Sequence, residues 1–312
     1  MHSIILDAKV TVPWCFPLTP LFSLGLVIDG DQIPGNHILP APNAYRSVFR
    51  KPDGSYDWEG ELDYGWEMVD RASRGSLAAV IMEPILSVGG MLTLPSGYLS
   101  AMKAHCSRRG MLLILDEAQT AIGRAGDMFA FEHEGVAPDI LTLSKTPGNG
   151  LPLNAVVTST HIAEVAQQNG FLFLTTHFND PLPAAVGLKV LEIVVRDNLV
   201  ARSRAMGLKL HGGLQRLKDR YGRIGDVRGR GLLAAIEIVK DRESEAPAPE
   251  LGDRLAAKMM ALGLSANVST IASFAGMFRI APPVTVSEEN LELGLGIMEE
   301  AFRCTEDSLP SY

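Results

Sequence analysis

Short apolar runs alternate with helical patterns through the middle of the chain. The runs at residues 77–82 (LAAVIM) and 112–115 (LLIL) contain no polar residue. Between them, residues 95–110 have helical spacing, basic residues in the last turn and Gly110 as a stop signal. This strand–helix–strand order, with strands that are apolar throughout, predicts two parallel strands buried on both faces of a sheet.

The same pattern continues toward residue 200. DILTLSK (139–145) and NAVVTS (154–159) are predicted to be further strands of the series, and residues 183–197 and 199–221 have helical spacing. An alternation of strands and helices is typical of an α/β fold with a mostly parallel sheet.

Beyond residue 200 the pattern changes. A glycine-punctuated segment leads into a strand of alternating character, and a polar, proline-rich loop follows. A smaller α+β domain is predicted from these elements: the strand segment 225–241, the loop 243–250, a helix over 251–262, a strand within 276–283 and a closing amphipathic helix from Ser287.

These patterns predict a large domain over residues 39–200 and a small C-terminal domain over residues 201–312. Residues 1–38 are rich in proline and show no clear periodicity, and we expect a foreign or poorly ordered leader there. The apolar stretch 10–28 is interrupted by prolines and lacks a basic start, which fits neither a membrane helix nor an ordinary signal peptide.

Composition narrows the class of partner. The chain has 312 residues, 46% of them hydrophobic, which is enough for a large core and two domains. The formal charge of −8, with no run of Lys or Arg, argues against nucleic acid or an anionic membrane as a partner. Three scattered cysteines without a CxxC pair indicate neither a disulfide framework nor a zinc site, and we expect a cytoplasmic protein.

Two charged residues follow two of the predicted parallel strands. Asp116 ends the run LLILD and Lys145 follows DILTLS. Alone, the aspartate would more commonly be a helix N-cap and the lysine a solvated side chain. Parallel neighbouring strands, however, would place both residues on the rim where α/β sheets bind ligands. A lysine there can form a Schiff base with pyridoxal phosphate (PLP), while an aspartate pairs with the pyridine nitrogen.

Residues 112–159 carry a family resemblance. The stretch LLILDEAQTAIGRAGDMFAFEHEGVAPDILTLSKTPGNGLPLNAVVTS contains D-E-x-Q-T, G-R, P-D-I and S-K-T-x-G-x-G in that order. It closely resembles the class III, fold-type-I PLP-dependent aminotransferases. TTHFNDPLPAAVGLKVLE, IGDVRGRGLL and FRIAPPVTVSEE look most like the 2,2-dialkylglycine decarboxylase members of that family. The resemblance covers about Leu39 to Arg303. It implies that residues 39–200 form the PLP-binding large domain in partial form.

The resemblance implies roles for the matching residues of the large domain. Lys145 would be the Schiff-base lysine and proton shuttle, and Asp116 would pair with the pyridinium nitrogen. Gln119 would hydrogen-bond the phenolic-oxygen side of the ring, with Ala118 beside it among the cofactor-binding residues. Thr176 would donate to the cofactor phosphate of the neighbouring subunit, which implies a homodimer with a shared active site.

Two further sites are implied by the same resemblance. Arg279, in FRIAPP, would clamp the substrate carboxylate with both guanidinium nitrogens. Thr176, Phe178 and Asp180 would lie near an alkali-metal ion. Read by themselves, Gln119 is equally a polar residue at a helix start, Thr176 a strand residue and Asp180 a turn residue before a proline. An arginine between Phe278 and Ile280, by contrast, needs an anionic partner or ligand.

The reaction expected from the resemblance depends on Val88. Relatives that accept ω-amines carry a glutamate there, which neutralises the carboxylate-binding arginine. Its absence favours α-carboxylate donors, and we expect decarboxylation-coupled transamination of 2,2-dialkylglycines such as 2-aminoisobutyrate, with an oxo acid as acceptor. An ordinary class III α-amino acid aminotransferase is an alternative. So is an inactive truncated pseudoenzyme, because the family's N-terminal phosphate-binding loop and ring-stacking aromatic residue are not found here.

Overall fold

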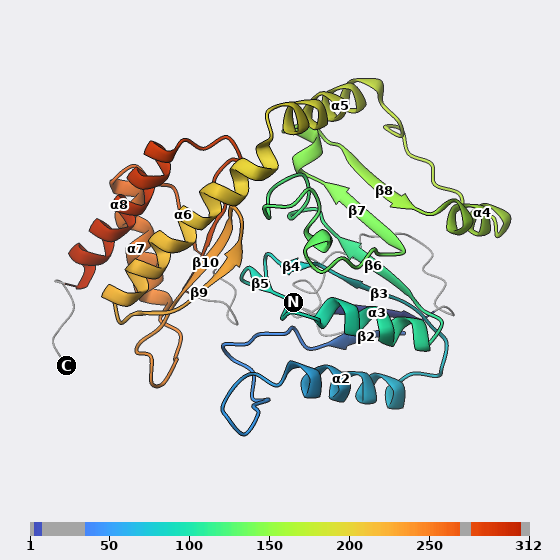
Figure 1. Ribbon diagram of the computed structural model, residues 1–312, viewed down its shortest axis with the longest axis horizontal. Helices are drawn as coiled ribbons and strands as arrows, with labels where there is room; N and C mark the ends of the chain where they lie inside the picture. Colours follow the sequence, from blue (N-terminus) through green and yellow to red (C-terminus); the bar gives the residue numbers. More distant parts are fainter. Residues whose placement is uncertain (1–2, 8–34, 269–275, 307–312) are drawn as a thin grey trace. The chain divides into compact units, whose positions relative to one another are not determined.

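The computed structural model describes residues 3–7, 35–268 and 276–306 (Figure 1). The chain divides into two compact units, each built from segments that are separate in the sequence. Unit 1 comprises residues 1–86, 94–121 and 129–193, and unit 2 comprises residues 87–93, 122–128 and 194–312. No helix in the described ranges is both long and apolar enough to cross a membrane.

Unit 1 is built on a six-stranded sheet. Its strands are β1 (Ser3–Asp7), β2 (Asn36–Leu39), β3 (Leu77–Met82), β6 (Leu112–Asp116), β7 (Ile140–Ser144) and β8 (Asn154–Thr158), in the order β2-β1-β3-β6-β7-β8. The central strands β3, β6 and β7 are parallel, as the alternation of strand and helix patterns predicted. Leu113 and Leu115 of β6 are fully buried. The predicted α/β fold is confirmed.

The outer strand β8 differs from the prediction, because it runs antiparallel to β7 instead of continuing the parallel series. Only residues 145–153 connect the two strands. A parallel crossover needs about a dozen residues or more, usually with a helix, so this short connection can only reverse the chain. The apolar run predicted the strand but not its direction.

Residues 1–38, expected to be a foreign or poorly ordered leader, contain two strands where the structure describes that segment. Residues 3–7 form β1, which lies between β2 and β3 and pairs antiparallel with both. Residues 36–38 belong to β2. Four apolar or small residues, SIIL, make too short a run to show a period, and the strand forms because both of its edges find partners. Residues 8–34 lie outside the described residues.

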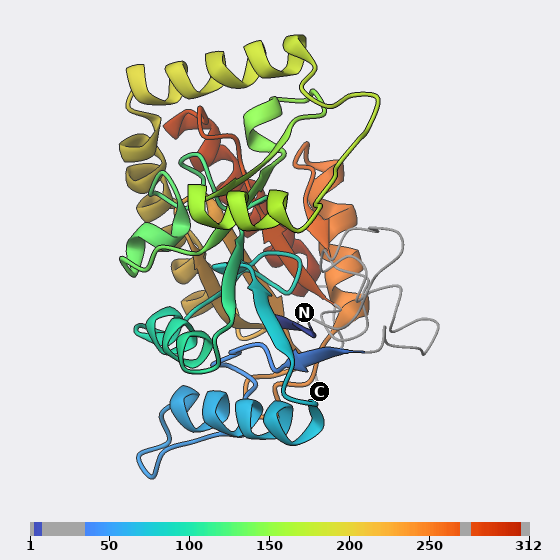
Figure 2. The same cartoon turned by 90° about the vertical axis from the view of Figure 1, so that its right-hand side faces the viewer.

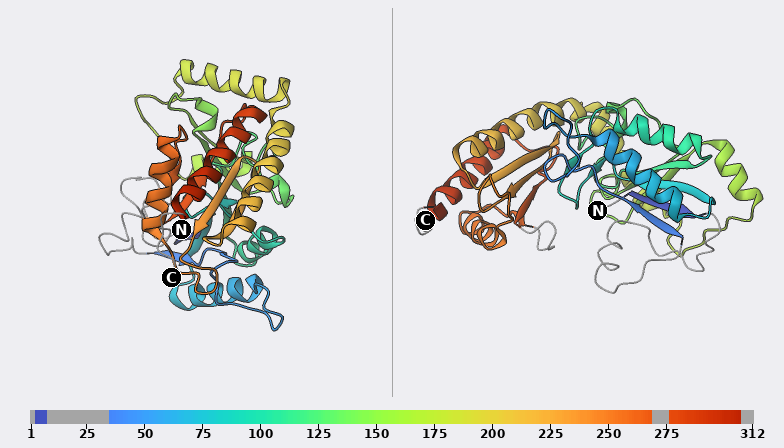
Figure 3. Two further views of the ribbon diagram at one scale, coloured as in Figure 1. Left: turned by 90° about the vertical axis from the view of Figure 1, so that its left-hand side faces the viewer. Right: turned by 90° about the horizontal axis from the view of Figure 1, so that it is seen from below.

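Helices α2 (Trp58–Ala72) and α3 (Tyr98–Arg108) lie on the same side of this sheet (Figure 3, right panel). Asp57 caps α2 by accepting a hydrogen bond from the Gly60 amide at 3.2 Å. Helix α3 confirms the helix expected between the first two parallel strands. The remaining elements assigned wholly or mainly to unit 1 are β4 (Ile85–Leu86), the short 3₁₀ helices η1 (Ala130–His133) and η2 (Thr146–Gly148), α4 (Thr160–Gln168) and α5 (Pro181–Arg196).

Unit 2 contains an antiparallel sheet in the order β11-β12-β10-β9, with helices α6, α7 and α8 over one face of it (Figures 1 and 2). Leu214, Ile236, Phe278 and Phe302 lie in the core between the helices and the sheet. The elements are β5 (Leu92–Thr93), α6 (Leu199–Arg220), β9 (Ile224–Arg230), β10 (Leu233–Ile238), α7 (Pro249–Ala261), β11 (Asn267–Val268), β12 (Met277–Ile280) and α8 (Glu288–Glu306).

Candidate active site

Asp116 and Lys145 stand at the same edge of the large sheet. Asp116 is the last residue of β6 and lies opposite Thr142 in the parallel register with β7. Lys145 follows Ser144, the last residue of β7. Because β6 and β7 are hydrogen-bonded neighbours, the carboxyl ends of these two strands bring the aspartate and the lysine to one rim of unit 1.

The Asp116 side chain is buried, with 7% of its surface exposed. Its Oδ1 accepts a hydrogen bond from the Ala118 amide at 3.0 Å, which is a local turn contact. Within the described part of the chain, no Lys, Arg or His pairs with it. A carboxylate that is buried with one neutral donor is incompletely compensated and favours a cationic partner.

Lys145 has a strained backbone. Its φ of 62° and ψ of −82° lie outside the regions that residues with a side chain normally occupy, and such residues cost of order 1–3 kcal/mol. Its side chain is exposed, and the amine has no ion pair or hydrogen bond among the residues described. Backbone strain of this kind is concentrated at functional sites, where the surrounding structure holds it.

The loop after β6 carries Ala118 and Gln119, both half-buried, and is fastened by Glu117. The Glu117 carboxylate is fully buried and accepts hydrogen bonds from Thr120 Oγ1 at 3.0 Å and from the amides of Ala130 at 2.8 Å and Phe131 at 3.0 Å. Burial raises the pKa of Glu117 despite these donors.

Sequence reasoning assigned no role to Glu117. The signal that could have found it is its place directly after a buried strand, where a second acid needs buried donors. Its contacts hold the segment that follows Asp116, so Glu117 supports the rim without reaching the candidate site itself.

Thr176, Phe178 and Asp180 lie in an exposed segment between α4 and α5. The Asp180 carboxylate accepts a hydrogen bond from His177 Nδ1 at 2.8 Å when that nitrogen carries the proton. The described residues contain no cluster of three or more His, Cys, Asp or Glu that could hold a metal ion. The alkali-metal site therefore stays a prediction, as does the phosphate contact of Thr176.

Arg279 lies in unit 2, in the middle of β12. It stands opposite Ala235 of β10 and Asn267 of β11, while its neighbour Phe278 points into the core on the other face. The side chain is half-buried and, in the described part of the chain, has no ion pair. An unpaired guanidinium on a partly buried sheet face can bind an anion.

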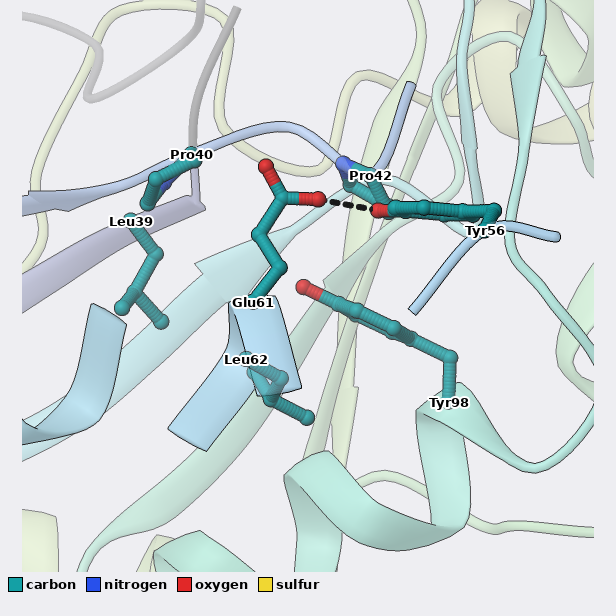
Figure 4. A pocket seen from close by; sticks show the side chains of 7 residues that line it. All are labelled: Leu39, Pro40, Pro42, Tyr56, Glu61, Leu62 and Tyr98. Carbon is teal, nitrogen blue, oxygen red and sulfur yellow. Dashed lines mark hydrogen bonds between the residues drawn. The ribbon is translucent and has the colours of Figure 1, made fainter. Parts of the chain in front are cut away.

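A second polar cluster lies at α2, away from these residues in the sequence. A shallow pocket without room for a water molecule is lined by Leu39, Pro40, Pro42, Tyr56, Glu61, Leu62 and Tyr98 (Figure 4). Glu61 accepts hydrogen bonds from Tyr56 and from Ser47 Oγ, the latter at 3.1 Å. Burial raises the pKa of Tyr56 and of Tyr98. With its carboxylate already engaged, this cluster fastens the segment after β2 onto α2 and is typical of structural packing.

An α/β sheet with a lysine and a buried aspartate at neighbouring strand ends is the arrangement expected in the large domain of a fold-type-I PLP-dependent transferase. The chain belongs to the class-III aminotransferase family, whose model matches residues 30–302. The family predicted from the sequence is therefore confirmed.

Relatives of known sequence and structure agree with this assignment. An uncharacterized aminotransferase of Schizosaccharomyces pombe is 50% identical over 276 residues, covering 88% of this chain and 62% of the relative. A leucine/methionine racemase of Thermococcus litoralis is 34% identical, covering 87% and 60%. The crystal structure of an (S)-enantioselective omega-transaminase from Thermomicrobium roseum has a TM-score of 0.81 at 31% identity, covering 92% and 63%. The chain thus spans about three fifths of the length of these relatives.

Class III aminotransferases use pyridoxal phosphate, and the residues present fit that cofactor. Asp116 is a buried carboxylate without a cation, which suits a protonated ring nitrogen. Lys145 presents a free amine from the neighbouring strand end, which suits a bond to an aldehyde.

Proposed function

We propose that this chain carries pyridoxal phosphate on Lys145 and transfers an amino group from an amino acid to an oxo acid. The observation that carries the proposal is the buried carboxylate of Asp116, which lacks a cation within the described ranges, at the strand end beside Lys145. A structural ion pair would have satisfied this acid. Its incomplete compensation instead supports a site built for a cationic ring.

The chain's own residues divide the chemistry between them. When bound, the cofactor supplies a ring that accepts electrons from the substrate carbon. Asp116 would hold the proton on the ring nitrogen. Lys145 would take and return the proton at the substrate carbon, since an amine on a flexible stem can reach several positions. Gln119 would orient the phenolic-oxygen side of the ring, with Ala118 beside it.

We propose α-carboxylate amino donors as the substrate class. Arg279 has no ion-pair partner among the described residues, and Val88 stands where ω-amine relatives have a neutralising glutamate. The specific reaction proposed is decarboxylation-coupled transamination of 2,2-dialkylglycines such as 2-aminoisobutyrate. Ordinary transamination of α-amino acids uses the same residues and differs in which bond to the substrate carbon breaks.

The cofactor proposal is tested by borohydride reduction after incubation with pyridoxal phosphate, followed by peptide mapping. We expect the pyridoxyl adduct on Lys145 and its loss in Lys145→Ala. Lys103→Ala is the matched control, because that lysine is paired with Asp139 at 2.6 Å and should not carry the adduct. A protein that stays colourless and unmodified would contradict the proposal and favour an inactive partial chain.

The reaction is tested by separating two products. Carbon dioxide released from 2-aminoisobutyrate in the presence of pyruvate supports the decarboxylating reaction. Transamination of L-alanine without such release would leave the ordinary aminotransferase.

We propose that the active form is a homodimer in which Thr176 serves the neighbouring subunit. Thr176 is exposed in a segment whose apolar side chains are also exposed. Exposed apolar surface of this extent favours a protein partner. The exposed apolar residues of this segment are Phe171, Leu172, Phe173, Leu174 and Phe178, and the elements on either side of it add Val156, Val157, Val165, Leu182, Leu188 and Leu191.

A further inference from the structure

One face of the small sheet in unit 2 carries charged residues in register. Ala235 of β10 lies opposite Arg228 of β9 on one side and opposite Arg279 of β12 on the other. Directly opposite residues on hydrogen-bonded strands share a face of the sheet. The two arginines therefore flank the small side chain of Ala235 on the face away from the core.

Glu237 stands on the same face, two residues along β10 from Ala235. It is therefore the diagonal neighbour of Arg228 across one strand pair and of Arg279 across the other. Diagonal neighbours are about 7–8 Å apart at the backbone, within reach of long side chains. The Glu237 carboxylate thus belongs to the strand between the two arginines.

Arg228 holds this carboxylate. Its Nη1 lies 2.6 Å from Glu237 Oε2 and 2.9 Å from Asp226 Oδ2. Its Nε donates to the Gly90 carbonyl at 2.6 Å, and its side chain is only 9% exposed. A guanidinium fixed by a backbone carbonyl and two carboxylates is held in one geometry, so Glu237 is drawn to the β9 side of the sheet.

Both acids beside Arg228 belong to its ion-pair network. Asp226 and Glu237 face Arg228, Lys218 lies 3.8 Å from Asp226, and Arg230 adds a further base on the same face of β9. Arg279, by contrast, has no ion pair among the residues described.

We propose that Arg228 is a specificity-determining residue, which keeps Glu237 away from Arg279 and so leaves the Arg279 guanidinium open to a carboxylate anion. The identity of that anion as a substrate carboxylate rests on the proposed function. Without Arg228, the Glu237 side chain could turn toward Arg279. Glu237 would then compete with the substrate carboxylate for the Arg279 guanidinium.

The test measures how fast phenylglyoxal modifies Arg279, by peptide mapping of the full chain, because the reagent attacks guanidinium groups that are not engaged. It needs no cofactor and no turnover. We expect Arg228→Met to slow the reaction at Arg279 roughly two- to fivefold, the range for an ion pair of partly exposed groups. Arg228→Met/Glu237→Gln should restore the original rate, and Glu237→Gln alone should leave it unchanged.

Control variants separate this effect from general loosening. Arg220→Met removes an ion pair with Glu299 between α6 and α8 and should leave the Arg279 rate unchanged. Arg228→Gln keeps hydrogen-bond donors near the buried acids, and it replaces Arg228→Met if circular dichroism shows that the latter is unfolded. The inference would be overturned if the folded Arg228 variant showed an unchanged rate of phenylglyoxal modification at Arg279. It would also be overturned if Arg228→Met/Glu237→Gln slowed that reaction as much as Arg228→Met does.

The same mapping keeps the two proposals distinct. Pyruvate should protect Arg279 from phenylglyoxal in the natural chain and protect it less in Arg228→Met. If the variants change the rate as expected but pyruvate gives no protection, the α-carboxylate part of the proposed function fails while the competition for Glu237 stands.

Discussion

The Glu117 carboxylate accepts a 2.8 Å hydrogen bond from the backbone amide of Ala130. This contact, with that to Phe131, closes the loop that begins directly after Asp116. Glu117 therefore anchors the loop that follows Asp116, the acid proposed to bind the cofactor ring. We infer that Glu117 supports the position of Asp116 without taking part in the chemistry.

We predict that Glu117→Ala lowers the free energy of unfolding by at least about 3 kcal/mol, because three hydrogen bonds to one charged group are lost together. Glu117→Gln should cost less, because its amide oxygen still accepts. Urea denaturation measures both. Glu132→Ala, which removes an exposed acid that accepts one 3.3 Å hydrogen bond from the Phe129 amide, is the control and should cost no more than about 1 kcal/mol. Equal effects of Glu117→Ala and Glu132→Ala would contradict this account.

A second prediction concerns the segment that follows Lys145. A Cβ at Gly187 of α5 would lie 2.4 Å from Leu153 Cδ2, and one at Gly148 would lie 3.3 Å from Leu153 Cβ. Leu153 thus packs the lysine loop onto α5. Gly187→Ala should cost at most about 1 kcal/mol, because Leu153 Cδ2 is the end of a half-buried side chain that can move and because alanine favours the helix over glycine.

Leu153→Ala should relieve that clash. In denaturation experiments, the double variant Gly187→Ala/Leu153→Ala should therefore be more stable than the sum of the two single changes predicts. If the changes in the free energy of unfolding simply added, the side chains at positions 187 and 153 would not be in steric conflict.

The parts of the site that the sequence predicts are those set by local rules. Asp116 and Lys145 were found because apolar runs mark buried parallel strands, and because ligand-binding residues gather where such strands end. The direction of β8 was missed because it depends on the length of the connection at 145–153, and β1 was missed because its run is too short to show a period.

The supporting contacts could not be predicted in the same way. Glu117 finds its donors at Ala130 and Phe131, beyond any helical or strand period. Arg228 and Glu237 meet only because the β9–β10 register makes them diagonal neighbours, and a shift of one residue would place them on opposite faces. Such pairs follow from the fold and are not visible in the order of residues.

A third prediction concerns pH. His105 is buried, stacks on Trp66 with ring centroids 5.2 Å apart, and has Nε2 3.0 Å from Asp63. Burial, aided by Arg108 and Arg109, lowers the pKa of His105. His105 therefore binds a proton more readily in the unfolded chain than in the folded one. The stability that depends on a neutral His105 is complete above the unfolded pKa of about 6.5 and is lost as the pH falls below it.

The measurement compares the free energy of unfolding at about pH 7.5 and about pH 5.5, on either side of the unfolded pKa. The loss at the lower pH should be smaller in His105→Gln than in the natural chain. His161→Gln, which changes an exposed histidine of α4, should keep the original dependence. A dependence that is equally steep in all three proteins would assign it to other groups.

The last prediction tests self-association through β8. Val156 and Val157 are 68% and 51% exposed, although consecutive strand residues point to opposite faces, so both faces of this strand are uncovered. The strand is also at the edge of the sheet, where unpaired backbone groups accept another strand, and an antiparallel edge can pair with a copy of itself about a twofold axis.

Val156→Lys places a charge on this edge and should shift the protein toward the monomer in sedimentation velocity at equal concentration. Val48→Lys, at a loop residue that is 88% exposed, should not. If both variants associate as the natural chain does, the proposed dimer does not use β8, and the exposed segment around Thr176 would have to find its partner through α5.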